Sequence, residues 1–546
     1  MGKILTRVLC LVCMLALMMG SLTVGAYAAE AELMDITIFL GNEAPPADAA
    51  GLQFIREKFG VNIIFQGNPA NSKDKLNILL ASEDYPDAIV NQKDDIYTKF
   101  VQSGHVVALD EYLDAAPNYK AAIEKYMQFY RNESDGKLYF LPYGFNEEPH
   151  LDNAFIVRMD LWEAIGAPEI KTNSDLGQAA KLMQEAMPEV NGRKTYPFVF
   201  FFGDTWGDEW YDKVAVAAQG QTMFQKCNLA ANGQRLQMVD YMLATDEFKS
   251  AMKFANQMYR EGLADPQSAV AKASEYENGL NDGKNFIGIT TWSGMGINAS
   301  LASAGHPEQV IEPMFLKWDG YDGKTFYTNQ WGAGSSISMW ITDKCSEEKI
   351  RKIFEIADYM NTDEGAPLGW WGVKDIHYTA DESGRMTFTP LAEELIATDS
   401  KWALKMGAWL YTFGAPSGRN KAGQGYEIGR DAAYLSSTYT ETERKYADML
   451  GYTAFDDPFI EDFIGAENTA LNAAFVLPDN SPEIAIKAKA DTLCNQVTAQ
   501  LFLAKSEEQF EEIYAQAIAD LQAMGYDKFV KIYSDNLERI QDQMGL

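Results

Sequence analysis

The N-terminal part of the chain alternates between two hydrophobic periodicities. Short apolar runs over 35–40 (DITIFL) and 61–65 (VNIIF) predict strands, and the apolar residues of 52–59 recur at the spacing of a helix that ends at the following glycine. A helix over 71–81 then leads to a third short strand over 85–90. Strands that alternate with helices predict a parallel sheet of the α/β class.

The edge of this sheet where the strands end is a candidate binding region. Ligands of α/β proteins gather in the loops that follow the carboxyl ends of parallel strands. In this chain those loops follow Leu40 and Val90. We therefore expect polar side chains after these two residues to face a ligand.

Later in the chain, several helices have recognisable starts. Apolar stripes at helical spacing run over 248–259, 350–357 and 510–524. Ser346 is expected to cap the second of these helices and Ser506 the third. These stripes predict packing against a core and indicate no chemistry.

The chain has no long linker rich in proline or serine and no internal repeat. With 546 residues, of which 47% are hydrophobic, it is long enough for two large lobes and too apolar to be disordered. A chain of this size without flexible connections forms either one large unit or lobes joined by short crossovers. The second of these arrangements is a clamshell.

The first residues have the pattern of a secretory signal peptide. One lysine and one arginine precede or border an apolar run over 8–19, and Ala-Tyr-Ala follows over 26–28. We expect cleavage near Ala28 and a mature protein that is secreted and associated with the cell envelope. Cys10 and Cys13 lie inside the apolar run and not behind small residues at the cleavage point, so a lipobox is not predicted.

The cysteines beyond the signal are Cys227, Cys345 and Cys494, and their spacing fits no metal or redox motif. One disulfide among them is possible. Separate buried thiols are the favoured interpretation, because a chain this long does not need a covalent staple.

The formal net charge of −32 excludes whole classes of partner. An acidic surface repels nucleic acids and anionic membranes, so neither is expected to bind. An acidic ligand would need a cleft that is locally basic. For most of the carboxylates, solubility is a sufficient explanation.

Motifs of common enzymes are missing from the sequence. It contains no GxSxG, P-loop or HExxH motif. Adjacent carboxylates such as Glu147-Glu148 and Asp208-Glu209 are expected by chance among 78 acidic residues, and adjacency does not place two carboxyl groups across a cleft as a glycosidase requires. We expect no catalytic residue, no metal site and no cofactor. A secreted glycan-degrading enzyme stays as the alternative.

The aromatic residues point to a different chemistry. Several of the 11 tryptophans stand beside glycine and polar residues, at 205–207, 291–294, 330–332 and 369–372. A flat aromatic face flanked by hydrogen-bonding groups suits a sugar ring, which has an apolar face and an edge of hydroxyl groups. The competing interpretation is that each tryptophan fills a core.

Several segments, in their order along the chain, resemble one family. The segments are 54–61 (FIREKFGV), 74–87 (DKLNILLASEDYPD), 104–110 (GHVVALD), 135–142 (DGKLYFLP), 157–162 (VRMDLW), 258–263 (MYREGL), 286–292 (FIGITTW) and 372–378 (GVKDIHY). Together they resemble the large extracellular solute-binding proteins of ABC importers, in the Gram-positive branch associated with oligosaccharides and polysaccharides. A more distant similarity is to maltodextrin-binding proteins.

The resemblance implies the type II periplasmic-binding fold, an α/β clamshell of two discontinuous lobes that closes on a ligand without making or breaking a bond. Beyond the signal at 1–28, it implies a first lobe of 29–145 plus about 320–400 and a second of 146–319 plus about 401–546. The implied ligand is a carbohydrate, the implied partners are the permease subunits of an ABC transporter, and the protein is expected to be a monomer. The same fold binding a peptide or another polar solute is a further alternative.

The resemblance also implies polar contacts to the ligand from two stretches. Asn91 and Asp94 follow the strand that ends at Val90. Tyr143, Asn146 and Glu147 follow Leu-Pro and are expected beside the hinge and the cleft.

Among the aromatic candidates, Trp292 resembles the family's stacking tryptophan from the second lobe and is the strongest. The others stand beside small or polar residues and are Trp206, Trp331, Trp370, Trp371 and Trp409. Relatives that bind acidic polysaccharides often have a calcium loop where this chain has MPEVNGRK at 187–194. Two oxygen-bearing side chains there cannot supply the ~6 to 8 ligands that calcium prefers, so no structural calcium is predicted.

Overall fold

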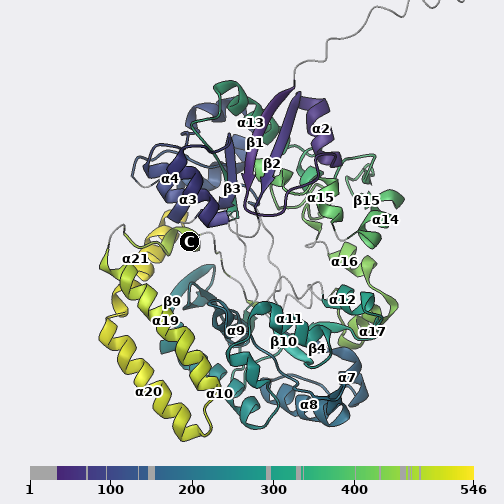
Figure 1. Ribbon diagram of the computed structural model, residues 1–546, viewed down its shortest axis with the longest axis vertical. Coiled ribbons are helices and arrows are strands. Elements are labelled where there is room, and N and C mark those ends of the chain that lie inside the picture. Colours follow the sequence, from purple (N-terminus) through teal and green to yellow (C-terminus); the bar gives the residue numbers. More distant parts are fainter. Residues whose placement is uncertain are drawn as a thin grey trace, which may run out of the picture.

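The structure is a computed structural model in which two lobes lie one above the other along the longest axis (Figure 1). It describes residues 33–546 except for 69–71, 94, 133, 146–153, 290–296, 327–333, 336, 400, 429–431, 455–462, 465, 467, 469 and 479–480. The mixture of helices with parallel strands confirms the α/β class predicted from the sequence.

The first lobe is built on a sheet of strand order β13-β3-β1-β2. Strands β1 (Met34–Leu40), β2 (Val61–Gly67) and β3 (Ala88–Gln92) are parallel, as predicted. Helices α2 (Ala50–Phe59) and α3 (Ser72–Ser82) connect them. Strand β13 (Ile337–Ile341), from far along the chain, adds to the sheet antiparallel to β3, and no local pattern predicted this pairing.

Helix α2 shows why the local prediction succeeded. Its apolar residues Leu52, Ile55 and Phe59 are buried against the sheet, as their helical spacing requires. The helix ends at Gly60, which adopts a φ of 68° and donates its backbone N–H to the carbonyl of Arg56. Glycine reaches this left-handed conformation without the steric cost of a Cβ atom.

The second lobe contains two three-stranded sheets among its described residues. In one, β4 (Phe155–Arg158) lies between β10 (Ile287–Ile289) and β11 (Ile311–Met314) and is antiparallel to both. The other is a meander of β7 (Gln221–Phe224), β8 (Cys227–Asn232) and β9 (Arg235–Tyr241). A large apolar core joins both sheets to the surrounding helices.

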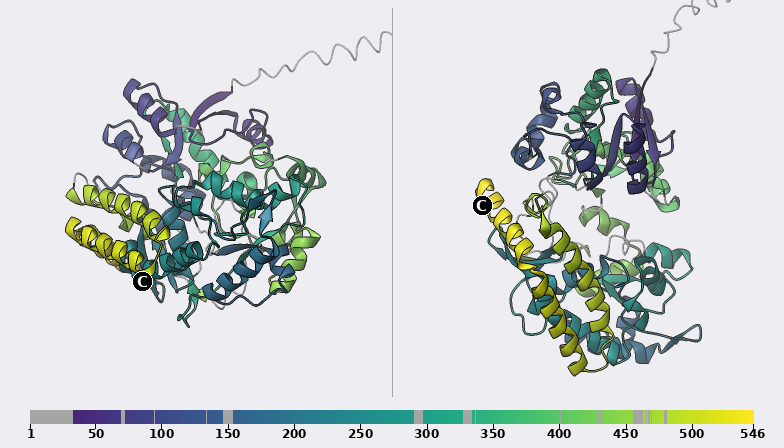
Figure 2. Two further views of the ribbon diagram at one scale, coloured as in Figure 1. Left: turned by 60° about the horizontal axis from the view of Figure 1, so that its bottom comes forward. Right: turned by 60° about the vertical axis from the view of Figure 1, so that its left-hand side comes forward.

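Three long helices at the end of the chain cover one side of the second lobe (Figures 1 and 2). They are α19 (Pro482–Phe502), α20 (Glu507–Met524) and α21 (Asp527–Met544). Helix α19 packs against α20 and against α10 (Asp246–Arg260), and α21 packs against β9. The side chain of Ser506 caps α20 by accepting a hydrogen bond from the Gln509 N–H, as predicted.

The predicted cap at Ser346 is also present, at the start of α13 (Glu347–Tyr359). The remaining helices are α4 (Asp95–Gln102), α5 (Pro117–Ile123), α6 (Met127–Tyr130), α7 (Met159–Ala164), α8 (Asn173–Ala186), α9 (Gly207–Ala217), α11 (Ala273–Asn281), α12 (Ile297–Ser303), α14 (Pro390–Thr398), α15 (Trp402–Met406), α16 (Ala432–Thr438), α17 (Glu441–Leu450) and α18 (Leu471–Ala474). The remaining strands are β5 (Glu189–Val190), β6 (Arg193–Lys194), β12 (Thr325–Phe326), β14 (Tyr378–Ala380), β15 (Met386–Phe388) and β16 (Phe463–Ile464).

Core packing shows where the chain passes between the lobes. Phe145 belongs to the core of the first lobe and Phe155 to that of the second, and the chain returns between Phe326 and Met339. A third, smaller core lies around Trp371. The region 401–438 packs with the first and third cores and α17 packs with the second, which differs from the predicted passage near residue 400. The apolar pattern alone does not reveal which core a helix joins.

The cysteines Cys227, Cys345 and Cys494 are free and buried, which confirms the interpretation as separate thiols. Burial raises the pKa of Cys345 to about 12, so this thiol stays protonated at neutral pH.

A buried carboxyl group in the second lobe makes stability depend on pH. Both carboxyl oxygens of Asp212, on α9, are buried and have no hydrogen-bond partner in the part of the chain that the structure describes. Burial raises the pKa of Asp212 well above its ordinary value, and the nearby carboxylates of Asp208 and Glu247 raise it further. The folded protein therefore holds a proton that the unfolded chain releases above about pH 4.

Because the pKa of Asp212 is higher in the folded protein than in the unfolded chain, stability falls as pH rises from about 4 toward neutral. Asp212→Asn removes this titration, so we expect the variant to be more stable than the natural chain at pH 7, by about 1 to 3 kcal/mol. Thermal unfolding at pH 4, 5, 6 and 7 should show the advantage shrinking toward pH 4. Asp535→Asn, at an exposed site on α21, is the control. If the stability gain of Asp212→Asn were the same at every pH, the raised pKa of Asp212 could not be its cause.

Candidate functional site

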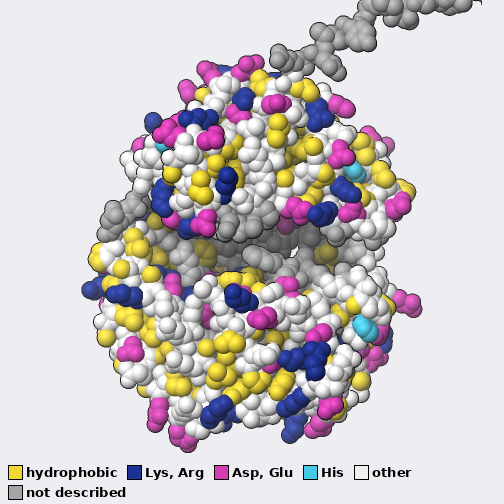
Figure 3. All heavy atoms as spheres, in the orientation of Figure 1, with side chains coloured by type: hydrophobic (Ala, Val, Ile, Leu, Met, Phe, Trp, Pro, Cys, Tyr) yellow, Lys and Arg dark blue, Asp and Glu magenta, His cyan; other side chains and the backbone are white. Residues whose placement is uncertain are grey.

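A hollow crosses the molecule between the two lobes (Figure 3). Three segments of the first lobe lie side by side next to the passages that lead into the second lobe. The Ser335 N–H donates to the Tyr143 carbonyl at 3.0 Å, the Gly144 N–H to the Ala415 carbonyl at 2.8 Å, and the Ser417 N–H to the Phe145 carbonyl at 2.9 Å. These hydrogen bonds hold the base of the first lobe together where the lobes join.

An aromatic cluster lies at this base and consists of Tyr143, Trp370, Trp409 and Tyr411; we call it the hinge aromatic cluster. Tyr411 is at its centre. Trp370 stacks on Tyr411 with ring centroids 4.3 Å apart and planes 12° apart, and Tyr143 and Trp409 lie 5.5 and 5.6 Å from Tyr411. Tyr143 is buried, whereas the other three side chains are half-buried. The cluster therefore has aromatic surface that is exposed to solvent.

The backbone at Trp409 is strained. This residue has a φ of 73°, in the left-handed region that a bulky side chain rarely adopts. Such a conformation costs ~1 to 3 kcal/mol and persists only where the surrounding structure fixes it. Gly407 and Gly414, on either side, also have positive φ, and the short 3-10 helix Leu410–Phe413 follows directly. The packing around Trp409, including its contact with Tyr411, therefore outweighs this cost.

The hydroxyl groups of the hinge aromatic cluster stay neutral. Burial raises the pKa of Tyr143 to about 12, although a hydrogen bond with Ser335 partly opposes this rise. Burial also raises the pKa of Tyr411 well above its ordinary value, and Tyr143 and Glu427 add to the rise. Neutral phenols can donate and accept hydrogen bonds. The cluster thus combines flat apolar rings with neutral polar groups.

Asn91 stands elsewhere on the same lobe, at the carboxyl edge of its sheet. It follows Val90 on β3 and pairs with Ser338 of β13. A Cβ atom on Gly41 would come within 2.2 Å of the Asn91 Oδ1 atom, so only glycine lets the Asn91 side chain lie over the end of β1. This is the strand edge that the sequence marked as a candidate binding region.

Comparison with known proteins adds to this geometry. No family model matches the chain. Lipoprotein LipO of Bacillus subtilis is 25% identical over 346 residues, which are 62% of this chain and 66% of LipO, so the chain spans just under two thirds of that relative. The fructooligosaccharide ABC transporter substrate-binding protein FusA of Streptococcus pneumoniae is 24% identical over 407 residues, which are 66% of this chain and 72% of FusA.

The structure of FusA from S. pneumoniae in complex with kestose matches 93% of this chain and 100% of its own, with a TM-score of 0.64 and 17% identity. This chain has the fold of an ABC-transporter substrate-binding protein. The two-lobed α/β clamshell and the family resemblance that the sequence predicted are thereby confirmed.

In this substrate-binding-protein fold, the predicted site residues have different locations. Tyr143, Trp370 and Trp409 come together in the hinge aromatic cluster. The fourth member, Tyr411, was missed, because nothing in its local sequence distinguishes it from a core residue. Asp94, Asn146, Glu147, Trp292 and Trp331 lie outside the described residues.

The other two tryptophans do not join the cluster. Trp206 belongs to the second lobe, where it is half-buried and its ring centroid lies 4.7 Å from that of Phe201. Trp371 is only 1% exposed and stacks on Phe388 inside the third core, with centroids 4.6 Å apart. A ring enclosed on all sides cannot offer a face to a ligand. This corrects the prediction that Trp371 contacts the ligand.

The segment in which no calcium site was predicted forms the hairpin of β5 and β6. Asn191 and Gly192 make its turn, with φ values of 51° and 72°. Among the residues that the structure describes, no group of three or more His, Cys, Asp or Glu side chains is arranged to hold a metal ion. In the same residues, no helix has the length and apolar character needed to cross a bilayer.

Proposed function

We propose that this chain is the substrate-binding component of an ABC transporter and that it captures an oligosaccharide between its lobes. The observation that carries the proposal is the hinge aromatic cluster, which combines half-buried rings with neutral hydroxyl groups beside the segments that join the lobes. The stacked pair Trp370 and Tyr411 provides a rigid platform for the apolar face of a sugar ring. FusA, which has the same fold, is named for fructooligosaccharides and was seen with kestose.

Capture follows from the arrangement of the lobes. A ligand that touches both lobes stabilises the closed state relative to the open one, so binding and closure are the same event. The first lobe contributes Trp370 and Trp409. We propose that Trp292 supplies the opposing ring from the second lobe and that Asn91, Asp94, Asn146, Glu147 and Trp331 add contacts around the sugar. The relatives are binding proteins of transporters, and binding without turnover is accordingly part of the proposal.

The remaining features of the proposal concern location and partners. The signal-peptide pattern supports export with cleavage near Ala28, and the family supports delivery of the ligand to permease subunits by a monomer. From the packing of the cores, we propose a first lobe of 33–145 and 337–438 and a second lobe of 154–326 and 441–546.

Thermal unfolding in the presence of oligosaccharides tests the function. A true ligand at a concentration of 100 times Kd stabilises the folded protein by about 2.7 kcal/mol. A panel of fructo-, xylo-, galacto- and malto-oligosaccharides and their uronic-acid-containing counterparts should include at least one that raises Tm, with saturable binding in calorimetry. A panel in which no sugar binds would count against the proposal, as would the release of cleaved products.

Trp370→Ala should weaken binding of the identified sugar about 10- to 100-fold, or about 1.4 to 2.8 kcal/mol, because it removes one ring of the stacked platform. Calorimetry measures the change in Kd. Trp402→Ala is the matched control, since Trp402 is also a half-buried tryptophan of the first lobe but lies on α15, outside the cluster. If Trp370→Ala and Trp402→Ala bound the sugar with equal affinity, the binding site would have to lie outside the hinge aromatic cluster.

A further inference from the structure

A cation without a carboxylate partner lies at the carboxyl edge of the first sheet. Lys93 follows β3 directly, is half-buried, and has its Nζ atom 3.8 Å from the centroid of the Phe140 ring. Within the described part of the chain, no carboxylate pairs with Lys93. Its neighbours Lys73 and Lys99 both pair with Asp95.

Other hydrogen-bond donors share this side of the sheet. Asn91 of β3 pairs with Ser338 of β13, and Trp340 is two residues from Ser338, so these three side chains face the same side of the sheet. Lys93 follows directly after the last residue of β3. The Ser338 hydroxyl and the Trp340 Nε1 atom are buried and have no hydrogen-bond partner in the described structure. Two buried groups that can donate hydrogen bonds therefore have no partner on this side of the sheet. We call Asn91, Lys93, Ser338 and Trp340 the donor cluster.

Aromatic rings make the surroundings of the donor cluster apolar. The ring of Tyr97, on α4, lies 5.2 Å from Trp340 and 6.2 Å from Phe140, both edge to face. Desolvation lowers the pKa of Lys93 to about 7. A charged ammonium in such surroundings is costly until an anion neutralises it, and a bound carboxylate would restore its charge.

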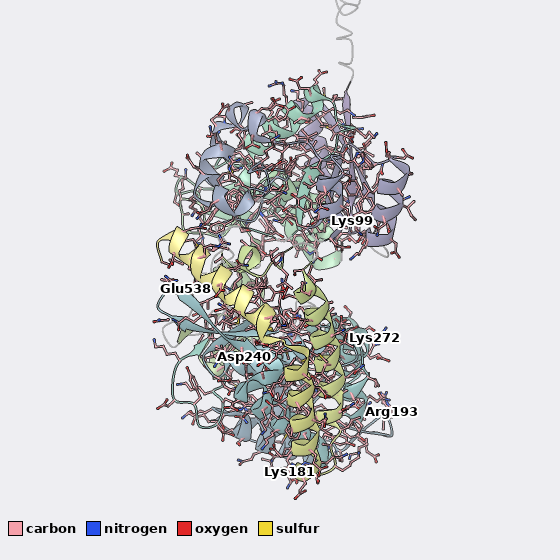
Figure 4. The ribbon with its side chains drawn as sticks, turned by 90° about the vertical axis from the view of Figure 1, so that its left-hand side faces the viewer. Lys99, Lys181, Arg193, Asp240, Lys272 and Glu538 are labelled. Carbon is pink, nitrogen blue, oxygen red and sulfur yellow. The ribbon has the colours of Figure 1, made fainter. Side chains whose placement is uncertain are left out.

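The donor cluster is close to the hollow. Figure 4 shows Lys99, on α4, at the border of the first lobe that faces the second lobe. Lys93 precedes α4 by two residues, at the end of β3 where ligands of α/β proteins gather.

We propose that the donor cluster receives the carboxylate of an acidic sugar, so that the captured oligosaccharide contains a uronic acid or another carboxylate-bearing residue. Lys93 supplies the charge, and the Asn91 amide supplies a second hydrogen bond. This inference rests on the proposed function and narrows its substrate class. It also explains how so acidic a protein accepts an acidic ligand: the cleft is locally basic at one point.

Calorimetry with matched sugars tests the inference. The probes are oligogalacturonides, glucuronoxylo-oligosaccharides and sialyllactose, each beside the same sugar after reduction of its carboxyl group. We expect one acidic sugar to bind at least tenfold more tightly than its reduced form. Lys93→Met should abolish that difference without weakening the reduced sugar and without lowering Tm. Lys99→Met, which removes an exposed and paired lysine of the same region, should leave the difference intact.

The outcomes separate the inference from the function. If reduced sugars bind and acidic forms bind no more tightly, the inference is overturned while oligosaccharide capture stands. If Lys93→Met still preferred the acidic sugar over its reduced form, the inference would also be overturned. If no sugar in the panel or among the neutral oligosaccharides binds, the proposed function falls and the inference falls with it.

The pH dependence gives an independent readout. The acidic sugar should bind about tenfold more weakly at pH 8 than at pH 6, because Lys93 loses its proton between these values. The titratable groups that surround the site are Asp95, Tyr97, Lys73, Tyr130 and Tyr139. Hydrogen bonding to Lys73 lowers the pKa of Asp95 and burial raises that of Tyr97 and Tyr130, so these do not titrate in this window. Tighter binding of the sugar at pH 8 would show that the neutral Lys93 amine accepts a hydrogen bond from a sugar hydroxyl. That result would overturn the inference.

Discussion

Lys226→Met should lower the free energy of unfolding by about 3 to 5 kcal/mol, the largest effect that we expect from a single polar substitution. The Lys226 Nζ atom lies 2.5 Å from both carboxylate oxygens of Asp208 and 2.7 Å from the Asn495 Oδ1 atom. The two charged side chains are 6% and 1% exposed. Removing the ammonium leaves the Asp208 carboxylate buried without its counterion.

The pH dependence of this loss has a definite sign. Burial already raises the pKa of Asp208, although Lys226 opposes the rise. Without Lys226 the pKa rises further, so the folded variant takes up a proton that the unfolded chain gives up above about pH 4. The stability loss should therefore be larger at pH 7 than at pH 5. Urea denaturation followed by circular dichroism at both values measures it.

An exposed ion pair provides the control for this variant. Lys531 and Asp535 pair on α21, with side chains 73% and 61% exposed, and Lys531→Met should change stability by less than about 0.5 kcal/mol. In Lys226→Met/Asp208→Asn the uncompensated charge is gone, so part of the lost stability should return. A loss below about 1 kcal/mol for Lys226→Met alone would show that water reaches Asp208.

Trp371→Ala should lower the free energy of unfolding by about 3 to 5 kcal/mol while leaving the ligand affinity of the folded protein nearly unchanged. The Trp371 ring stacks on Phe388 and meets Tyr378 and Tyr434 edge to face, with centroids 6.3 and 5.8 Å away. Its Nε1 atom donates to the Gly425 carbonyl at 3.4 Å. Truncation leaves a large cavity in a small core. Denaturation and calorimetry on one preparation give both quantities.

The neighbouring Trp370 provides a comparison variant for this prediction. Trp370 is half-buried and stacks on Tyr411, so Trp370→Ala should cost less stability and more affinity than Trp371→Ala. The pair of variants thus separates packing from recognition at adjacent positions of one chain. If Trp371→Ala weakened ligand binding as much as Trp370→Ala does, the third core would have to shape the binding site directly.

If the donor cluster and the hinge aromatic cluster act on one ligand, recognition uses two chemistries at two places on the first lobe. Stacking on Trp370 tolerates many sugars, because each sugar ring has an apolar face. A carboxylate at Lys93 would discriminate among them, since a neutral sugar leaves the donors unpaired. Specificity would then come mainly from the strand edge and affinity mainly from the rings near the hinge.

Much of the first lobe could be predicted because its signals are local. The apolar runs of β1 and β2, the stripe of α2 and the stop at Gly60 each involve residues within a few positions of one another, where backbone geometry sets the spacing. The capping serines Ser346 and Ser506 were recognisable for the same reason. The order of the family-like segments also carried enough information for the overall fold.

Tertiary packing decided the rest. Trp370 and Trp371 stand in one Gly-Trp-Trp-Gly stretch, yet one belongs to the hinge aromatic cluster and the other to a core, because their side chains leave the chain in different directions and meet different elements. Tyr411 and Lys93 contact Trp370 and Phe140, each distant in sequence, and the roles proposed for them rest on these contacts. The sequence alone determined the local elements and the clamshell fold, and it indicated the residue types of the proposed sugar site. Which rings and charges would face the proposed sugar depends on contacts between distant residues, which no local pattern records.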